Sequence, residues 1–172
     1  IINAVLAATA LISCPELGAK TMHITKGITT AKWQGRLEKI NKGNIQKNIP
    51  DSSEVWIDGG HNIAGAETIK KWVEDKKINN VILVCGFLKN KDVKKILLIL
   101  KNSIKYIVFV PLQGTKNSYK LNDLISIAKK LNIKCYYKNS IKKALYSKLI
   151  LPNSKILIFG SLYLAGEALS LD

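Results

Sequence analysis

The chain has 172 residues, of which 47% are hydrophobic, and a formal net charge of +15 at pH 7. This length and composition predict a folded protein with a real core, and no apolar run reaches the roughly 20 residues that cross a bilayer. Nearly all of the positive charge is lysine, with Arg36 the only arginine, which argues against nucleic-acid binding because arginine is preferred for base and phosphate contacts.

The first 32 residues do not follow the pattern of the rest of the chain. Ile2 to Cys14 is an Ala-rich helical run, and Thr25 to Lys32 is a second, short helical piece. The apolar run before Cys14 resembles the core of a secretion signal, but no basic segment precedes it. The chain begins with Ile rather than Met, so we expect further residues before it in the intact protein.

Cys14, Cys85 and Cys135 are odd in number and far apart, with no CxxC spacing. Such cysteines are typical of a reduced, cytoplasmic protein, and the last two lie in apolar runs where a free thiol acts as a small hydrophobe.

Gly35 to Ile40 alternates like an edge strand that pairs antiparallel, and the polar stretch Asn41 to Ser53 reads as a loop. Beyond it, short runs rich in Val, Ile, Tyr and Phe predict strands. These runs are Val55 to Asp58, Val81 to Cys85, Lys105 to Val110, Lys134 to Tyr137 and Lys155 to Phe159.

Helical spacing of apolar residues separates these runs. The predicted helix stripes are Ala66, Ile69 and Val73; Val93, Ile96, Leu97 and Leu100; Leu121, Leu124, Ile125 and Ala128; and Ile141, Ala144, Leu145 and Leu149. Strands alternating with helices of this length form right-handed crossovers. The sequence therefore predicts an α/β fold with a doubly wound, mostly parallel sheet.

Ligands of such sheets bind beyond the carboxyl ends of the strands. "DGGHN" follows the first predicted parallel strand: Asp58 suits hydroxyl groups, the glycines allow close approach, and His61 offers a titratable imidazole. Equally, Asp58 and Asn62 suit helix caps around a glycine turn. The pattern alone leaves both interpretations open.

Other polar residues have plain structural interpretations. Ser161 follows a predicted strand. We interpret it mainly as the N-cap of the next helix, and a ligand contact is the alternative interpretation. His23 is interpreted as a surface residue, and Lys89 and Lys91 as a solvated turn. The chain has no GxxxxGK[ST] loop, nucleophile elbow or HExxH motif, so it predicts a ligand-binding domain without a complete catalytic apparatus.

Five stretches taken together resemble one family: "INAVLAATALI", "WQGRLEKI", "VWIDGGHNIAGAETI", "GFLKNKDVKKIL" and "ILIFGSLYLAGEAL". In this order they are similar to the C-terminal half of bifunctional dihydrofolate synthase/folylpolyglutamate synthase, a member of the Mur ligase superfamily. The resemblance implies a Rossmann-like C-terminal domain at 33–172. It also implies that residues 1–32 are the helical end of a preceding ATPase domain plus a hinge.

The resemblance implies an ATP-dependent amide ligase. Such an enzyme activates folate or dihydropteroate as an acyl phosphate, which the amine of L-glutamate then attacks. It is expected to be a cytoplasmic monomer. The P-loop and the magnesium site are expected in the missing N-terminal half, so the chain alone is expected to be inactive. By motif match, Asn3 corresponds to an adenine contact, Arg36 to an ATP contact and Asp58 to a ribose contact. His61 and Ser161 correspond to residues needed near the incoming glutamate.

Two positions depart from the family pattern. Gln34 stands where Pro is common, and Gly60 stands where Ala is common. We interpret Gly60 as making the turn after the strand more permissive. Two other functions remain open: a Mur-type peptidoglycan precursor ligase, and a stand-alone nucleotide- or folate-binding module without ligase activity.

Overall fold

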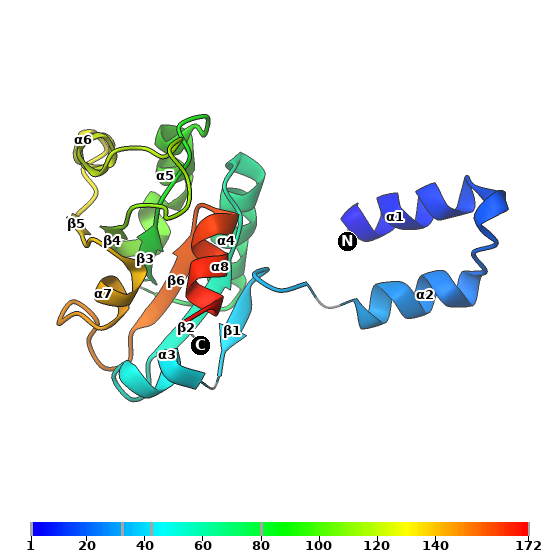
Figure 1. The fold of residues 1–172 in the computed structure, drawn as a ribbon, viewed down its shortest axis with the longest axis horizontal. Coiled ribbons are helices and arrows are strands. Elements are labelled where there is room, and N and C mark those ends of the chain that lie inside the picture. Colours follow the sequence, from blue (N-terminus) through cyan, green and yellow to red (C-terminus); the bar gives the residue numbers. More distant parts are fainter. Residues whose placement is uncertain (1, 32, 42, 80, 172) are drawn as a thin grey trace. The chain divides into compact units, whose positions relative to one another are not determined.

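The computed structural model describes residues 2–31, 33–41, 43–79 and 81–171 and divides the chain into two compact units, Ile1–Gln34 and Gly35–Asp172. The first unit consists of α1 (Ile2–Ile12), a 3-10 turn (Pro15–Leu17) and α2 (Thr21–Thr30) (Figure 1). The first predicted helix thus ends two residues before Cys14, and the second begins four residues before Thr25. Lys32, the predicted end of the second helix, lies outside the described residues.

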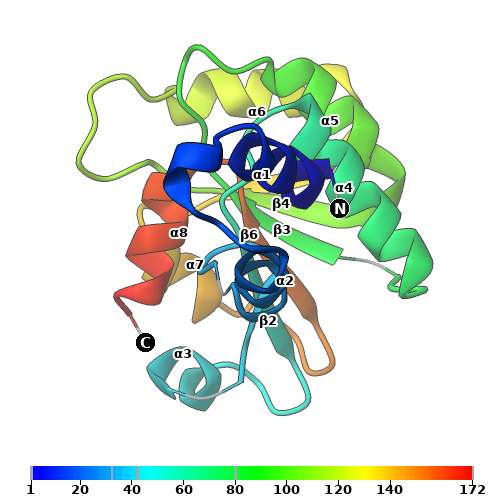
Figure 2. The same ribbon diagram turned by 90° about the vertical axis from the view of Figure 1, so that its right-hand side faces the viewer.

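The second unit is built on a six-stranded sheet with the order β1-β2-β6-β3-β4-β5 (Figures 1 and 2). β1 (Glu38–Ile40) pairs antiparallel with β2 (Glu54–Asp58), and all other neighbouring pairs are parallel. The remaining strands are β3 (Val81–Cys85), β4 (Ile104–Phe109), β5 (Cys135–Tyr137) and β6 (Lys155–Phe159). The predicted mostly parallel sheet with one antiparallel edge strand is confirmed.

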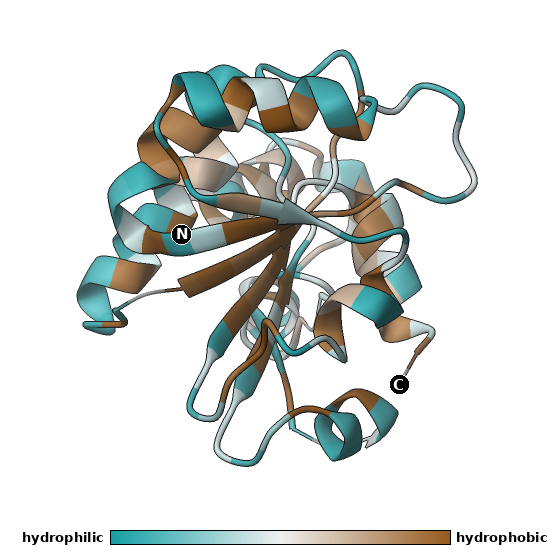
Figure 3. Ribbon diagram, turned by 90° about the vertical axis from the view of Figure 1, so that its left-hand side faces the viewer, coloured by the Kyte–Doolittle hydropathy of each residue, from teal (hydrophilic) through white to brown (hydrophobic). Residues whose placement is uncertain are grey.

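Helices cover both faces of this sheet, as a doubly wound fold requires. One core contains the apolar stripes of α4 (Ile63–Asp75), α5 (Val93–Leu100) and α6 (Leu121–Lys130). The other contains those of α3 (Gly43–Asn48), α7 (Ile141–Leu145) and α8 (Leu162–Leu169). Figure 3 shows the strands mostly apolar and the helices polar on their outer sides. Each fully buried Ile, Leu or Phe contributes about 1.5–3 kcal/mol to folding.

Three details differ from the sequence prediction. The polar stretch Asn41 to Ser53 contains the short helix α3, anchored by the fully buried Ile45. The edge strand begins only at Glu38, because Gly35 and Leu37 have positive φ angles of 68° and 45° and form a turn. Leu149 lies beyond the end of α7, where its carbonyl accepts a hydrogen bond from the Tyr106 hydroxyl.

Among the described residues, no helix is long and apolar enough to cross a membrane. The three cysteines are free. Cys85 is completely buried in β3, and this burial raises the pKa of its thiol well above the usual value. It therefore packs as a small apolar side chain, as predicted.

Candidate active site

The carboxyl ends of β2, β6 and β3 meet at the middle of one sheet edge. Asp58 is aligned with Phe159, and Phe159 with Cys85, so the turns after these three strands begin side by side. The backbone N–H of Gly160 donates to the carbonyl of Gly60 at 2.8 Å. A Cβ at Gly160, which has a φ of 110°, would lie 2.7 Å from the carbonyl oxygen of Gly86. The packed turns therefore require glycine there.

Asp58 is buried, with 7% of its surface exposed, and both of its carboxylate oxygens accept backbone hydrogen bonds. Oδ1 accepts from the N–H of Gly60 at 2.6 Å, and Oδ2 accepts from the N–H of Leu37 at 3.0 Å. Leu37 is 21 positions earlier in the chain. Asp58 does not cap α4; it joins the turn after β2 to the loop before β1.

This loop, Gly35 to Glu38, holds the only arginine of the chain. The carbonyl of Gly35 accepts from the N–H of Gly59 at 2.7 Å, and the N–H of Gly35 donates to Oε2 of Glu38 at 2.7 Å. With the bond from Leu37 to Asp58, both sides of Arg36 are fixed while its own side chain is exposed. The loop therefore presents a guanidinium group beside the turn after β2.

His61 is half-buried at the end of this turn, and its ring orientation is set by one hydrogen bond. Nδ1 lies 2.9 Å from the carbonyl oxygen of Gly59, which can only accept, so Nδ1 carries the proton. In the neutral ring, Nε2 then has a free lone pair that can accept a proton. Within the described part of the chain, no hydrogen bond engages Nε2.

Asn62, the next residue, is the N-cap of α4. Its side-chain oxygen accepts from the N–H of Gly65 at 2.8 Å. Such a cap stabilises a helix by about 1 kcal/mol. The capping interpretation of "DGGHN" is therefore right for Asn62 and wrong for Asp58.

Ser161 caps α8 and is 3% exposed. Its Oγ accepts from the N–H of Tyr163 at 3.1 Å, which leaves its hydroxyl hydrogen available to another acceptor. Further along α8, the carboxylate of Glu167 accepts from the N–H of Ile141, and burial raises its pKa. The Glu of "GSLYLAGE" therefore links α8 to the start of α7.

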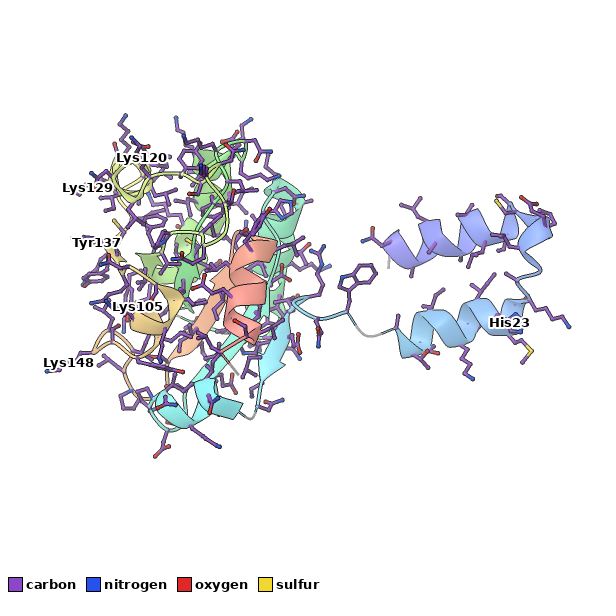
Figure 4. All side chains as sticks on the ribbon, in the orientation of Figure 1. His23, Lys105, Lys120, Lys129, Tyr137 and Lys148 are labelled. Carbon is purple, nitrogen blue, oxygen red and sulfur yellow. The ribbon has the colours of Figure 1, made fainter. Side chains whose placement is uncertain are left out.

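Asn3 and His23 belong to the first unit, where both side chains are exposed. His23 lies on α2 (Figure 4), and its Nδ1 accepts from the N–H of Lys20 at 3.3 Å. The proposed adenine contact of Asn3 stays a prediction, as do the roles of Arg36, Asp58, His61 and Ser161.

Sequence reasoning missed the part played by Gly35, Leu37 and Glu38. The only local signal is an acid three residues after a glycine, which suits a turn closed by its own carboxylate. Among the residues that the structure describes, no group of three or more His, Cys, Asp or Glu side chains could hold a metal ion.

Comparison with known proteins gives a family match over most of the second unit. Residues 41–171 match the family model described as "Dihydrofolate synthetase, C-terminal domain". A search of curated proteins finds no match.

Solved structures share the fold at low sequence identity. The E. coli FolC in complex with DHPP and ADP has a TM-score of 0.72 and 22% identity, covering 96% of this chain and 38% of its own. The Mycobacterium tuberculosis folylpolyglutamate synthase complexed with ADP and AMPPCP has a TM-score of 0.71 and 21% identity, covering 89% and 35%. The bifunctional folylpolyglutamate synthase/dihydrofolate synthase of Yersinia pestis, complexed with AMPPNP and Mn, has 0.71 and 18%, covering 95% and 37%. The chain thus spans little more than a third of these proteins.

Proposed function

Because this chain belongs to the family of dihydrofolate synthetase C-terminal domains, we propose that it is the C-terminal part of an ATP-dependent ligase that adds L-glutamate to folate, dihydropteroate or both. The observation that carries the proposal is the bonded unit at the end of β2. There Asp58 and Gly59 hold the loop of the only arginine against the turn that carries His61, whose Nε2 has no hydrogen-bond partner among the described residues. The nucleotides named in the complexes of similar fold support ATP as the co-substrate.

In the proposed reaction, a carboxylate oxygen of the pterin substrate attacks the γ-phosphorus of ATP, and ADP leaves. The amine nitrogen of glutamate then attacks the carbonyl carbon of the resulting acyl phosphate. The bond from this carbon to the phosphate oxygen breaks, and inorganic phosphate departs. The ammonium form of glutamate loses one proton before the attack, and the nitrogen loses a second as the amide forms.

Within this reaction, Nε2 of His61 accepts a proton from the glutamate nitrogen, since the hydrogen bond to Gly59 holds its lone pair on the far side of the ring. The Ser161 hydroxyl donates to a glutamate carboxylate. Positioned general bases contribute roughly a hundredfold to ten-thousandfold to rate.

Arg36 contacts the phosphates of ATP with its planar, always-charged fork. Asp58 mainly positions this loop, and each of its oxygens keeps a second lone pair for a ribose hydroxyl. Asn3 contacts adenine. Magnesium accompanies ATP, and the proposal takes none of its ligands from the described residues of this chain. The free cysteines support a cytoplasmic location, and we infer a monomer.

The test uses a chimera in which the ATPase region of the E. coli FolC precedes this chain. Glutamate incorporation into dihydropteroate and folate is measured with MgATP. In His61→Asn the shorter amide can still donate to the Gly59 carbonyl but loses Nε2, so kcat should fall by about a hundredfold or more.

His61→Gln is the control for positioning, because its amide reaches the position of Nε2 and can form hydrogen bonds there but cannot take up a proton, so its kcat should stay about as low as that of His61→Asn. Thermal melts of both variants should match the parent. A normal rate in His61→Asn would contradict the proposed role. So would a loss of activity that is accompanied by a lower melting temperature, because unfolding would then explain it.

A further inference from the structure

A hollow lies on the same edge of the sheet as the candidate active site, over the ends of β3 and β4. It has a volume of about 560 Å³ and is formed by the loops after these two strands. We call it the lysine groove, after Lys89, Lys116 and Lys120, which line it together with Thr115, Ser118 and Tyr119. Figure 4 shows Lys120 at the start of α6. None of these residues has a part in the reaction proposed above.

Backbone pairing joins the two loops of the lysine groove. Leu88 and Ser118 form an antiparallel bridge, the N–H of Lys89 donates to Asn117 at 3.0 Å, and the N–H of Tyr119 donates to Phe87 at 2.9 Å. The Tyr119 hydroxyl also donates to the carbonyl of Lys91 at 3.3 Å. The main chain beneath the lysines is therefore fixed, although their side chains are exposed.

The residues that line the lysine groove carry positive charge only, and the acid next to them in the chain, Asp123, follows the lining residue Asn122 in the first turn of α6. The lining contains three ammonium groups and no carboxylate. Among the described residues, none of the three lysines forms an ion pair. The nearby Asp92 is engaged by Lys95 at 3.3 Å and by the N–H of Lys95. Such a cavity favours a ligand that carries several negative charges over a neutral one.

The lysine groove is close to the candidate active site along the sheet. The strand order places β6, which Ser161 follows, directly beside β3, and β4 beyond it. Neighbouring strands are about 4.8 Å apart, so the groove begins roughly 5–10 Å from the turn after β6. A flexible chain of a few residues could therefore occupy both places at once.

We propose that the lysine groove binds the γ-linked glutamate tail of the ligase product, an inference that rests on the proposed function. Each glutamate joined through its side-chain carboxylate keeps its own α-carboxylate free. A tail of three or more residues therefore presents carboxylates in a row to the three ammonium groups, and the hydroxyls of the groove add hydrogen bonds. Substrates that already carry a tail are held for the next addition.

Binding can be measured on this 172-residue chain without ATP. Glutamate, tri-γ-glutamate and penta-γ-glutamate are titrated calorimetrically at low salt. Penta-γ-glutamate should bind about tenfold or more tightly than glutamate, because several weak surface ion pairs act together. Tripolyphosphate is the competitor that distinguishes a polycarboxylate groove from a phosphate site.

The groove variant carries Lys89→Gln, Lys116→Gln and Lys120→Gln and should lose about tenfold in affinity for penta-γ-glutamate. The control variant, Lys71→Gln, Lys105→Gln and Lys148→Gln, removes the same charge from exposed lysines outside the groove and should change affinity by no more than about twofold. Figure 4 shows Lys105 and Lys148 apart from Lys120.

Equal losses in the two variants would overturn the proposal, because net charge alone would then explain binding. So would an absence of penta-γ-glutamate binding, or tripolyphosphate binding that penta-γ-glutamate does not displace. If the chimera ligates a first glutamate but the chain binds no penta-γ-glutamate, the groove proposal is wrong and the proposed ligase function stands. Tail binding lost only in the groove variant supports the groove even if the chimera fails to ligate.

Discussion

Glu54 forms two ion pairs within the sheet. Its two carboxylate oxygens contact Nζ of Lys39 at 2.6 Å and Nζ of Lys155 at 2.7 Å, one from each neighbouring strand. The hydrogen bonds from Lys155 and then Lys39 lower the pKa of Glu54 to about 2. The carboxylate therefore links β1, β2 and β6 at the end of the sheet opposite the candidate active site.

We expect Glu54→Gln to lower the free energy of unfolding by about 1 kcal/mol at pH 7, because solvent screens a pair with a quarter of its carboxylate side chain exposed. The folded pKa is below the unfolded one, so this contribution is complete above about pH 5 and disappears as pH falls toward 2. Urea unfolding at pH 7, 4 and 2.5 measures it. A difference between parent and variant that is as large at pH 2.5 as at pH 7 would contradict the charge interaction, since most of it should be lost by then.

Gly60 is limited by space and not by backbone conformation, which corrects the interpretation of a more permissive turn. Its φ is not positive, but a Cβ would lie 2.7 Å from Oδ1 of Asp58 and 2.8 Å from the ring of Phe159. Gly60→Ala should therefore destabilise the chain by about 1–3 kcal/mol.

Gly166→Ala is the matched control for Gly60→Ala. A Cβ at Gly166, in α8, meets nothing within 4 Å, so alanine should stabilise the helix by about 0.4–1 kcal/mol. Thermal melts of both variants should shift in opposite directions; equal shifts would show that the turn can relax around a methyl group.

At the scale of elements, the Gly35 to Glu38 loop depends on Asp58. In Asp58→Asn, either the buried N–H of Gly60 or the partly buried N–H of Leu37 faces an amide donor instead of an oxygen. An unsatisfied buried group costs about 1–3 kcal/mol. Since Arg36 is the only arginine, an arginine-specific protease cuts the chain at this loop alone.

We expect this protease to cut Asp58→Asn at least about fivefold faster than the parent, because cleavage follows opening of the loop. Asp51→Asn is the control, since Asp51 is exposed, and it should leave the rate unchanged. An unchanged rate in Asp58→Asn would mean that the loop is held by its own bonds.

Sequence predicted the five strands from β2 to β6 to within one residue at each end, because Val and Ile runs between helical stripes are distinctive. It placed the start of β1 three residues too early, at Gly35 and not at Glu38. It missed α3, whose polar stretch contains few apolar residues to show a period. At the site, sequence identified "DGGHN" but not the partner of Asp58, since Leu37 lies 21 residues away and contributes only its backbone. The lysine groove could not be predicted for the same reason. It forms only where Lys89 meets the loop at 115–120, which lies far along the chain.

At the scale of the whole molecule, the two units differ in how they are stabilised. Every buried residue among those described belongs to Gly35–Asp172. The described part of the first unit exposes large apolar side chains on both helices, including Leu6, Ile12 and Met22 at 63–68%. A helix pair of this size cannot bury a core by itself. In the proposed ligase, we expect these faces to be covered by the region that supplies the phosphate-binding loop.

The same division predicts what the chain can do alone. It has no GxxxxGK[ST] loop to hold a triphosphate, so the isolated chain should show no MgATP hydrolysis and no glutamate ligation above background. The chimera with the E. coli FolC ATPase region should show both. Phosphate release and glutamate incorporation are measured side by side for the chain, for the ATPase region and for the chimera. Magnesium-dependent turnover by the chain alone would mean that it contains a nucleotide site that neither its motifs nor its described residues reveal.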